Sequence, residues 1–409
     1  MRRVEIGQRS ETAHRANLSA ILRELHLRGP RSRSELVRIT GLTRSAIRGL
    51  IGEFAAAGLA SEDRAAALGT PGRPSALVHL NPERALALAL EIAVDSLAVA
   101  LVGLGGEVLA LARIDRQRGH TSVEQVVDDL VELAAIVDSR PTARAALVGV
   151  GVSIVGVVRR SDGLVSMAPN LGWRDAPLVE RLATALDLPV PIAVANDADL
   201  GALAELRRGA ARGAEDVLFI AGEVGVGGGL IVGGRPLTGT AGYAGEVGHM
   251  PINPDGVRCG CGSIGCWETE IGEGALLVRA GYPPDGGRAA VEAVLREAEA
   301  GSPVARGALD AVGHWLGVGL AGLVNIFNPG LVVLGGRLSR LYPFVAPTIE
   351  AELDRLALPG PRRLVRVVPA SLGVNASLLG AAELAFEPLL DDPAAWLHER
   401  QVVPVLATA

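Results

Sequence analysis

The sequence contains no lysine, so all 39 basic residues are arginines and no lysine can hold a nucleotide phosphate. It has no run of about 18 uncharged apolar residues, and its arginine-containing N-terminus has no apolar signal-peptide core. It has only three cysteines, which is too few for a disulfide framework. These absences predict a soluble, cytoplasmic protein that has no membrane partner.

Length and charge distribution indicate several domains. With 409 residues, of which 49% are hydrophobic, the chain is long enough for two or three packed cores. Residues 1–80 contain 13 arginines and 7 acidic residues, whereas the whole chain has a net charge of −6. A basic head on an acidic body predicts that the head binds a polyanion.

The three cysteines lie close together and favour a metal site. Cys259, Cys261 and Cys266 fall within eight positions, and His249 lies ten residues before the first of them. These four side chains can hold one tetrahedral Zn²⁺, and the glycines between them allow tight turns. Because four protein ligands leave no position for water, the predicted zinc is structural. The alternative is one disulfide and a spare thiol.

Residues 1–82 are predicted to form a winged helix-turn-helix DNA-binding domain. Residues 1–14 are expected to form a mobile arm, and apolar residues at helical spacing predict a first helix over 17–27. A capping-box pattern over 32–35 opens a second helix, and a tight turn over 41–43 precedes a third. The predicted DNA-contacting residues of this segment are Ser34, Thr43, Arg44, Ser45 and Arg48.

Residues 61–79 are predicted to form the wing. A turn-rich stretch leads into an alternating strand, and Arg73 at the tip is expected to enter the minor groove. The alternative for the whole head is a helical hairpin that makes oligomer contacts and carries exposed arginines. Asn81 and Pro82 mark the predicted boundary.

The remainder of the chain has the alternating strands and helices of an α/β fold. A first lobe, residues 83–198, is predicted to have strands at 86–94, 97–102, 108–113, 146–158 and 190–195 and helices at 121–138 and 175–187. A second lobe, residues 199–387, is predicted to have helices at 198–208, 304–327 and 374–386 and strands at 216–221, 228–233, 331–336 and 363–369. Residues 388–409 are a tail with no assigned role.

The motif His-x9-Cys-x-Cys-x4-Cys, preceded by Gly-Glu-x-Gly-His, closely resembles the signature of the ROK family of repressors and sugar kinases. The Asn-Leu-Gly-Trp loop over 170–173 and the Gly-Arg-Pro stretch of the wing also resemble that family. The resemblance implies an actin-like (ribonuclease H-like), two-lobed sugar kinase fold with an N-terminal winged helix-turn-helix domain.

The resemblance also implies a sugar pocket braced by zinc. The positions that match the family's sugar-binding residues are Asn170, Asn196, Asp197, Glu246, His249 and Glu268. In kinases of the family, the aspartate matching Asp197 is the general base. Taken alone, an Asn-Asp pair after a strand is usually a turn or a helix cap.

Two phosphate-binding loops of the family's kinases are altered in this chain. The loop Asp-x-Gly-Gly-Thr-Lys is replaced by 91–96, and Gly-Thr-Gly-x-Gly-Gly-Gly by 223–229. These changes remove glycines, a lysine and a hydroxyl, and they add Asp95 and Glu223, which are expected to repel phosphate. ATP binding is therefore expected to be weak, so Asp197 is a vestigial base and no residue is assigned as catalytic.

These observations predict a regulator of the xylose-repressor type that responds to a monosaccharide and binds operator DNA as a homodimer or homotetramer. One alternative is an ATP-dependent sugar kinase with an appended DNA-binding domain. Another is a repressor that binds no ligand.

Overall fold

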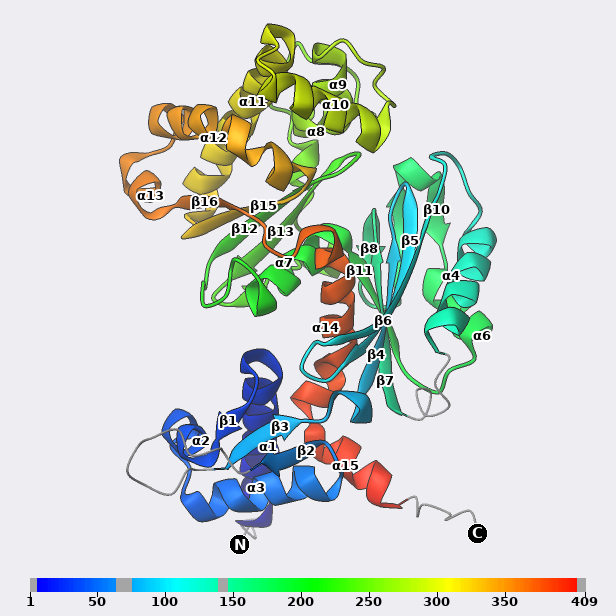
Figure 1. The fold of residues 1–409 in the computed structure, drawn as a ribbon, viewed down its shortest axis with the longest axis vertical. Helices are drawn as coiled ribbons and strands as arrows, with labels where there is room; N and C mark the ends of the chain where they lie inside the picture. The colour runs from blue at the N-terminus through cyan, green and yellow to red at the C-terminus, as the bar shows by residue number, and fades with distance from the viewer. Residues whose placement is uncertain (1–5, 64–75, 139–145, 403–409) are drawn as a thin grey trace, which may run out of the picture.

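The computed structural model describes residues 6–63, 76–138 and 146–402. A small domain of helices and a three-stranded sheet forms the head at one end of the molecule, and two α/β lobes make up the body (Figure 1). The structure therefore has the head and the two-lobed α/β body that the sequence predicts.

The head contains the predicted helix-turn-helix. Its helices are α1 (Ile6–Arg28), α2 (Arg33–Thr40) and α3 (Arg44–Ala56). The Ser32 side chain accepts a hydrogen bond from the Glu35 N–H at 3.2 Å, and the Glu35 side chain accepts one from the Ser32 N–H at 2.8 Å. This capping box fixes the start of α2. Gly41 has a φ of 71°, which lets the chain turn before Thr43 caps α3.

The predicted arm over residues 1–14 is wrong from Ile6 onward, because α1 already begins there. Residues 11–16 are polar side chains or alanines and are exposed, so they show no pattern of large apolar residues at helical spacing. Polar contacts accompany this turn of the helix: His14 Nε2 lies 3.1 Å from Glu53 Oε2, and Arg15 Nε donates to Asp392 Oδ1 at 3.1 Å.

A small sheet completes the head. Its strands are β1 (Arg31–Ser32), β2 (Ala60–Asp63) and β3 (Leu77–Leu80), in the order β1-β3-β2. Strands β2 and β3 pair antiparallel, as the two strands of a wing do. The predicted tip, including Arg73, lies outside the described residues.

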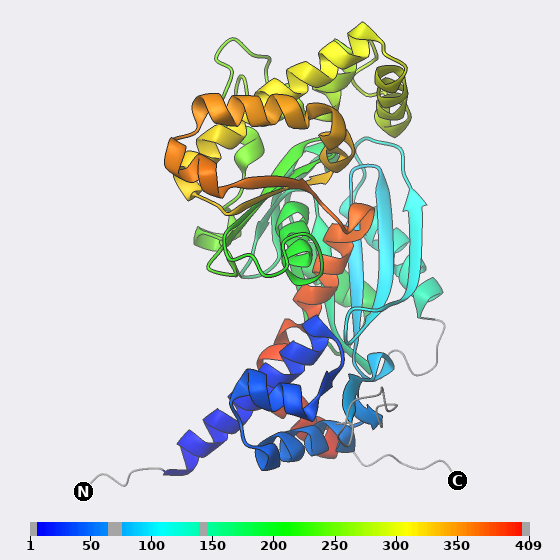
Figure 2. The same cartoon turned by 60° about the vertical axis from the view of Figure 1, so that its left-hand side comes forward.

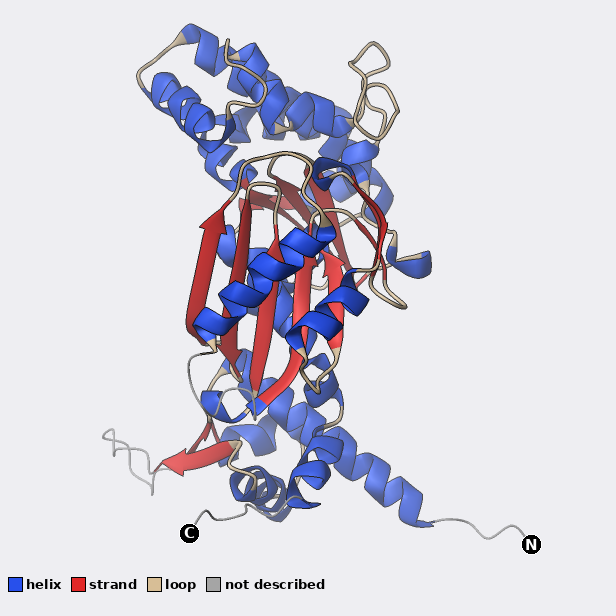
Figure 3. Cartoon of the chain, turned by 90° about the vertical axis from the view of Figure 1, so that its right-hand side faces the viewer, coloured by secondary structure: helices blue, strands red, loops and turns tan. Residues whose placement is uncertain are grey.

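The first lobe is built on a five-stranded sheet in the order β11-β7-β4-β5-β6. These strands are β4 (Leu86–Ile92), β5 (Ser96–Gly103), β6 (Val108–Asp115), β7 (Leu147–Ile154) and β11 (Ile192–Asn196). Helices α4 (Val123–Val137) and α6 (Leu178–Leu186) cover one face (Figure 3), where Leu88 and Leu90 pack. A separate sheet of β8 (Val157–Arg159), β9 (Leu164–Ala168) and β10 (Trp173–Ala176) replaces part of the predicted strand and helix.

The second lobe has its own sheet, in the order β14-β13-β12-β15-β16. Its strands are β12 (Val217–Gly222), β13 (Val226–Val232), β14 (Arg235–Pro236), β15 (Leu331–Gly336) and β16 (Arg366–Pro369). Its helices are α8 (Trp267–Ile271), α9 (Glu273–Arg279), α10 (Gly287–Glu299), α11 (Pro303–Phe327), α12 (Arg337–Leu356) and α13 (Pro359–Leu364). By length and composition α11 could span a membrane, but Leu316 and Leu320 lie in the core of this lobe.

Two further helices connect the parts of the molecule. Helix α7 (Asp197–Arg208) follows β11 directly, and α14 (Ala376–Asp391) packs against α7, β4 and β7. The predicted domains placed residues up to 387 in the second lobe, but α14 instead covers the sheet of the first lobe. The predicted tail contains the end of α14 and α15 (Pro393–Val402), and both helices contact α1 (Figure 2).

Candidate functional site

The predicted metal ligands come together at one point. The Sγ atoms of Cys259, Cys261 and Cys266 and one ring nitrogen of His249 all lie within 4.8 Å of one another. Cys261 Sγ is 3.6 Å from Cys266 Sγ, and Cys259 Sγ is 3.7 Å from His249 Nδ1. In a tetrahedral site with zinc–sulfur bonds of about 2.3 Å, the ligand atoms lie about 3.8 Å apart. The cluster therefore fits a single zinc ion.

The disulfide alternative does not match these positions. All three cysteines are free, and the 3.6 Å between Cys261 Sγ and Cys266 Sγ exceeds the bonded distance of about 2.05 Å.

Local contacts hold in place the loop that carries the three cysteines, which we call the metal-binding loop after its predicted role. Gly262 and Gly265 have φ angles of 98° and 67°, and a Cβ on Gly265 would overlap the Asn253 carbonyl oxygen. The Asn253 side chain donates to Glu270 Oε1 at 2.7 Å, which ties the loop to α8. The loop is thus shaped by its glycines and by contacts outside the ligand set.

All six predicted sugar-binding residues line one cavity between the lobes. Asn170 lies after β9, Asn196 ends β11, and Asp197 begins α7. Glu246 and His249 come from the segment before the metal-binding loop, and Glu268 lies on α8. The fold thus gathers six polar side chains from both lobes into one pocket, which we call the effector pocket.

The metal cluster forms part of the wall of this pocket. Cys261 lines the cavity, and His249 lies between the cluster and Glu246, with its Nε2 4.0 Å from Glu246 Oε2. Glu268 Oε1 is 2.9 Å from Cys259 Sγ, and Glu268 Oε2 accepts a hydrogen bond from the Val226 N–H at 3.4 Å. Any change in the cluster therefore reaches two of the carboxylates that line the pocket.

Asn196 and Asp197 link the pocket to α7. The Asn196 side chain donates to the Gly156 carbonyl at 2.9 Å and accepts from the Ala198 N–H at 2.8 Å, so it caps α7. Desolvation in the cleft, helped by Glu223, raises the pKa of Asp197 to about 7. Burial likewise raises the pKa of Glu246.

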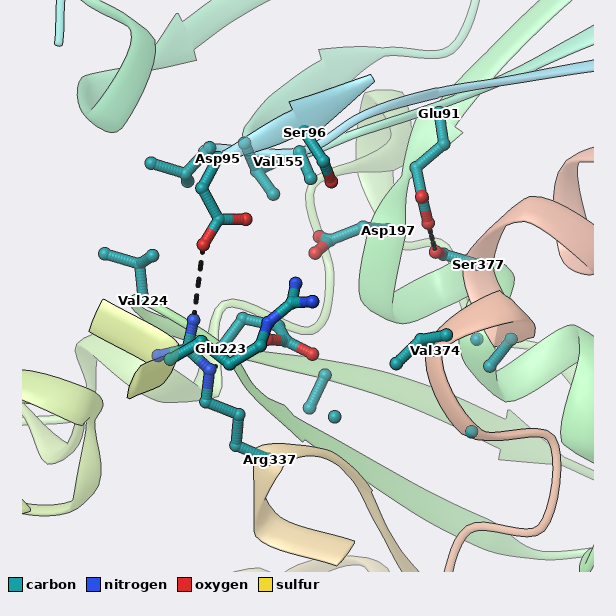
Figure 4. Close-up of a pocket in the computed structure, with 18 of the residues that line it drawn as sticks. Glu91, Asp95, Ser96, Val155, Asp197, Glu223, Val224, Arg337, Val374 and Ser377 are labelled. Atoms are coloured by element: carbon teal, nitrogen blue, oxygen red, sulfur yellow. Dashed lines mark hydrogen bonds and ion pairs between the residues drawn. The ribbon is translucent and has the colours of Figure 1, made fainter. Parts of the chain in front are cut away.

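A second cavity adjoins the effector pocket, and Asp197 lines both (Figure 4). It contains the two altered loops, and an arginine from α12 occupies it. Arg337 Nη2 lies 3.4 Å from Asp95 Oδ2, and Arg337 Nε lies 3.3 Å from Glu223 Oε2. The expectation that Asp95 and Glu223 would repel phosphate is therefore incomplete, because both carboxylates contact the guanidinium group of Arg337.

A second arginine extends this network across the lobes. Arg118 Nη2, from the segment after β6, lies 3.2 Å from Asp95 Oδ2, and its Nη1 pairs with Glu273 of α9. Sequence reasoning missed Arg118 and Arg337, since each is a single arginine with no motif around it. In this structure both guanidinium groups are engaged by carboxylates of the protein.

The head presents four of its predicted DNA-contacting residues at the start of α3. Thr43 caps α3, accepting from the Ala46 N–H at 3.2 Å, and its hydroxyl lies 3.0 Å from Ser45 Oγ. Arg44, Ser45 and Arg48 are exposed on the first turns of α3. Ser34 is also exposed, on α2. The opposite face of α3 is buried in the head, so Arg44, Ser45 and Arg48 face solvent.

Known proteins resemble both parts of this chain. The profile described as the ROK family matches residues 87–387. The xylose repressor of Bacillus spizizenii is 28% identical over 381 residues, covering 92% of this chain and 96% of that protein. A solved ROK family transcriptional regulator, a homologue of the E. coli MLC protein, aligns with a TM-score of 0.76 at 27% identity, covering 95% of this chain and 99% of its own.

An enzyme is also among the relatives. The glucokinase of Streptomyces coelicolor is 35% identical over 312 residues, covering 97% of the enzyme but only 70% of this chain. The repressor and the regulator match nearly the whole chain, whereas the glucokinase leaves almost a third of it unmatched. The family profile spans most of the sequence, and the chain belongs to the ROK family.

Proposed function

We propose that this chain is a sugar-responsive transcriptional regulator of carbohydrate genes that acts as a repressor. The observation that carries this proposal is that one chain combines a helix-turn-helix with a pocket lined by six polar side chains. The relatives that match nearly its full length include a xylose repressor and a ROK transcriptional regulator. The head would bind operator DNA, and the pocket would bind a monosaccharide effector.

The chemistry of the pocket suits a polyhydroxylated ligand. Carboxylates accept hydrogen bonds from hydroxyl groups, and asparagine amides both donate and accept. The residues proposed to contact the sugar are Asn170, Asn196, Asp197, Glu246, His249 and Glu268.

One structural Zn²⁺ is assigned to His249, Cys259, Cys261 and Cys266, which are close enough to share it. A zinc ion bound there would cross-link these four side chains and would not take part in catalysis. These ligands would orient the His249 ring toward the pocket and keep Cys259 beside Glu268. The geometry of the effector pocket would then depend on the metal.

Kinase activity is not part of this proposal. Phosphoryl transfer needs backbone N–H groups, hydroxyls or cations around the phosphates. Val224 has no hydroxyl, and Arg337 already pairs with Asp95 and Glu223. Asp197 is then a vestigial base that contacts the effector without activating it.

At the operator, Arg44, Ser45 and Arg48 are proposed to read base edges in the major groove. Ser34 and Thr43 would position the helix on the phosphates, and Arg73 of the wing would reach the minor groove. Two heads of a homodimer or homotetramer would read a palindromic site, because the two-fold symmetry of the protein matches that of the DNA. The protein would act in the cytoplasm.

A screen of monosaccharides by thermal shift, followed by operator binding with and without each hit, tests this function. We expect at least one aldose to raise the melting temperature and to change operator affinity. No stabilisation by any sugar would contradict the proposal. A coupled assay with ATP tests the kinase alternative, which the 35% identity to a glucokinase keeps relevant. Turnover would refute the assignment as a non-enzyme.

A further inference from the structure

The head is joined to the body through a buried polar cluster where three helices meet. His26 of α1 lies 3.1 Å from Glu383 Oε2 of α14, and both side chains are almost fully buried. From α7, Arg207 Nη1 donates to Glu383 Oε2 at 2.9 Å and Arg208 Nε donates to Glu383 Oε1 at 2.5 Å. Arg208 also donates to the Gly105 carbonyl at 2.7 Å. We call His26, Arg207, Arg208 and Glu383 the junction cluster.

Helix α14 holds the head through additional contacts. Ser19 Oγ donates to the Leu390 carbonyl at 2.6 Å, and Arg23 Nη2 lies 3.0 Å from Glu387 Oε2. The apolar side chains of α1 and α14 also share one core. The head is thus fixed to α14, and Arg208 at the end of α7 contacts His26.

Helix α14 begins beside the adjoining cavity and runs toward the head (Figure 2), and α7 packs against it. Asp197, the first residue of α7, and its cap Asn196 line the effector pocket, and Ser377 in the first turn of α14 lines the adjoining cavity. Helix α7 has 12 residues and so spans about 18 Å. One end of α7 therefore lies at the pocket, and the other end carries Arg207 and Arg208.

The two helices belong to different lobes. Ala198 and Ala202 of α7 pack with the sheet of the second lobe, whereas α14 packs on β4 and β7 of the first. Near the cavities the two helices are in backbone contact, because a Cβ on Gly380 would overlap the Leu200 carbonyl oxygen. Such close packing cannot be absorbed by side-chain rotation. A change in the angle between the lobes would pivot there and displace the far ends of the helices.

Building on the proposed function, we propose that α7 and α14 form the coupling element between the effector pocket and the DNA-binding head. Effector binding at the N-terminus of α7 changes the angle between α7 and α14. The junction cluster converts that change into a new position of α1. Two sites that bias one shared structural element in this way are thermodynamically coupled.

Hydrogen–deuterium exchange of the full-length protein tests the proposed coupling between the effector pocket and the head. This experiment does not require the operator sequence to be known. D-xylose and D-glucose are the probes, and the free protein is the reference. We expect the probe that binds to change exchange at the start of α7 and also in α1. A response at the pocket with none in α1 would overturn the inference and leave the effector site intact. No response to either probe, together with no thermal shift, would overturn the proposed function and this inference with it.

Variants of the junction separate coupling from folding. Arg208→Gln breaks the buried contact of α7, and Arg23→Gln weakens the more exposed contact between α1 and α14. Both should bind the probe sugar within about threefold of wild type, and the response in α1 should be lost. Arg362→Gln is the matched control, because Arg362 pairs with Glu350 and Asp354 within the second lobe. If Arg23→Gln folds, binds sugar and keeps a full α1 response, the route is wrong.

Discussion

Asn196→Ala tests whether the effector pocket and the start of α7 are one unit. The substitution removes the cap of α7, worth about 1 kcal/mol, and the hydrogen bond to the Gly156 carbonyl, worth about 1 kcal/mol more. The melting temperature should fall by about 2 °C in a protein of this size. Effector affinity should fall at least about tenfold, because a predicted sugar contact is also lost.

Two variants separate these effects. Ser122→Ala removes the cap of α4, where Ser122 Oγ accepts from the Gln125 N–H at 3.1 Å, and should lower stability without changing effector affinity. Asn196→Asp keeps a capping acceptor but loses the amide donor, so stability should recover more than affinity. Calorimetric titration with the effector found in the thermal-shift screen gives the affinities. Unchanged sugar binding by a folded Asn196→Ala variant would refute the placement of Asn196 at the ligand.

Three further changes are predicted. The pKa of Asp197 is raised from 3.8 to about 7, so folding takes up a proton and stability falls as pH rises through that window. Asp197→Asn should make the melting temperature fall less steeply between about pH 5 and 8, while the part due to Asp199, whose pKa is also raised to about 7, remains. An unchanged slope would exclude Asp197 as a contributor. Cys261→Ser should lose the metal, as measured by native mass spectrometry, and should also lose effector affinity, as measured by titration. The control Ser263→Ala should keep both. Sugar binding by the metal-free variant would show that the sugar site does not depend on the metal. Arg48→Ala should weaken operator binding by about 1–3 kcal/mol in fluorescence anisotropy without affecting the sugar. An equal loss in Arg355→Ala, on the second lobe, would point to a non-specific charge effect.

Local sequence signals located the head and the metal cluster well. Ser32, Glu35, Gly41 and Thr43 specify helix boundaries through contacts within a few residues, and the structure contains those contacts. The closely spaced cysteines likewise indicate a shared ligand set. Such features are readable because their causes lie within one short segment of chain.

Features with non-local causes were missed. Helix α12 contains Pro343 and Pro347, and internal prolines argue against a helix, yet its buried residues pack into the core of the second lobe. Arg337 begins that helix and reaches carboxylates 242 and 114 positions away in the sequence. No local pattern predicts such pairs, because only the folded chain brings their partners together.

The pairing of Arg337 changes how the altered loops are best understood. The two carboxylates of Asp95 and Glu223 would destabilise the folded protein if no cation lay beside them in the cleft. Arg337 and Arg118 supply that cation from opposite lobes, and both contact Asp95. The cavity lined by residues of the two loops 91–96 and 223–229 is thus bridged here by the protein's own ion pairs. These ion pairs can hold the lobes in a defined arrangement, and under the proposed function effector binding would change that arrangement.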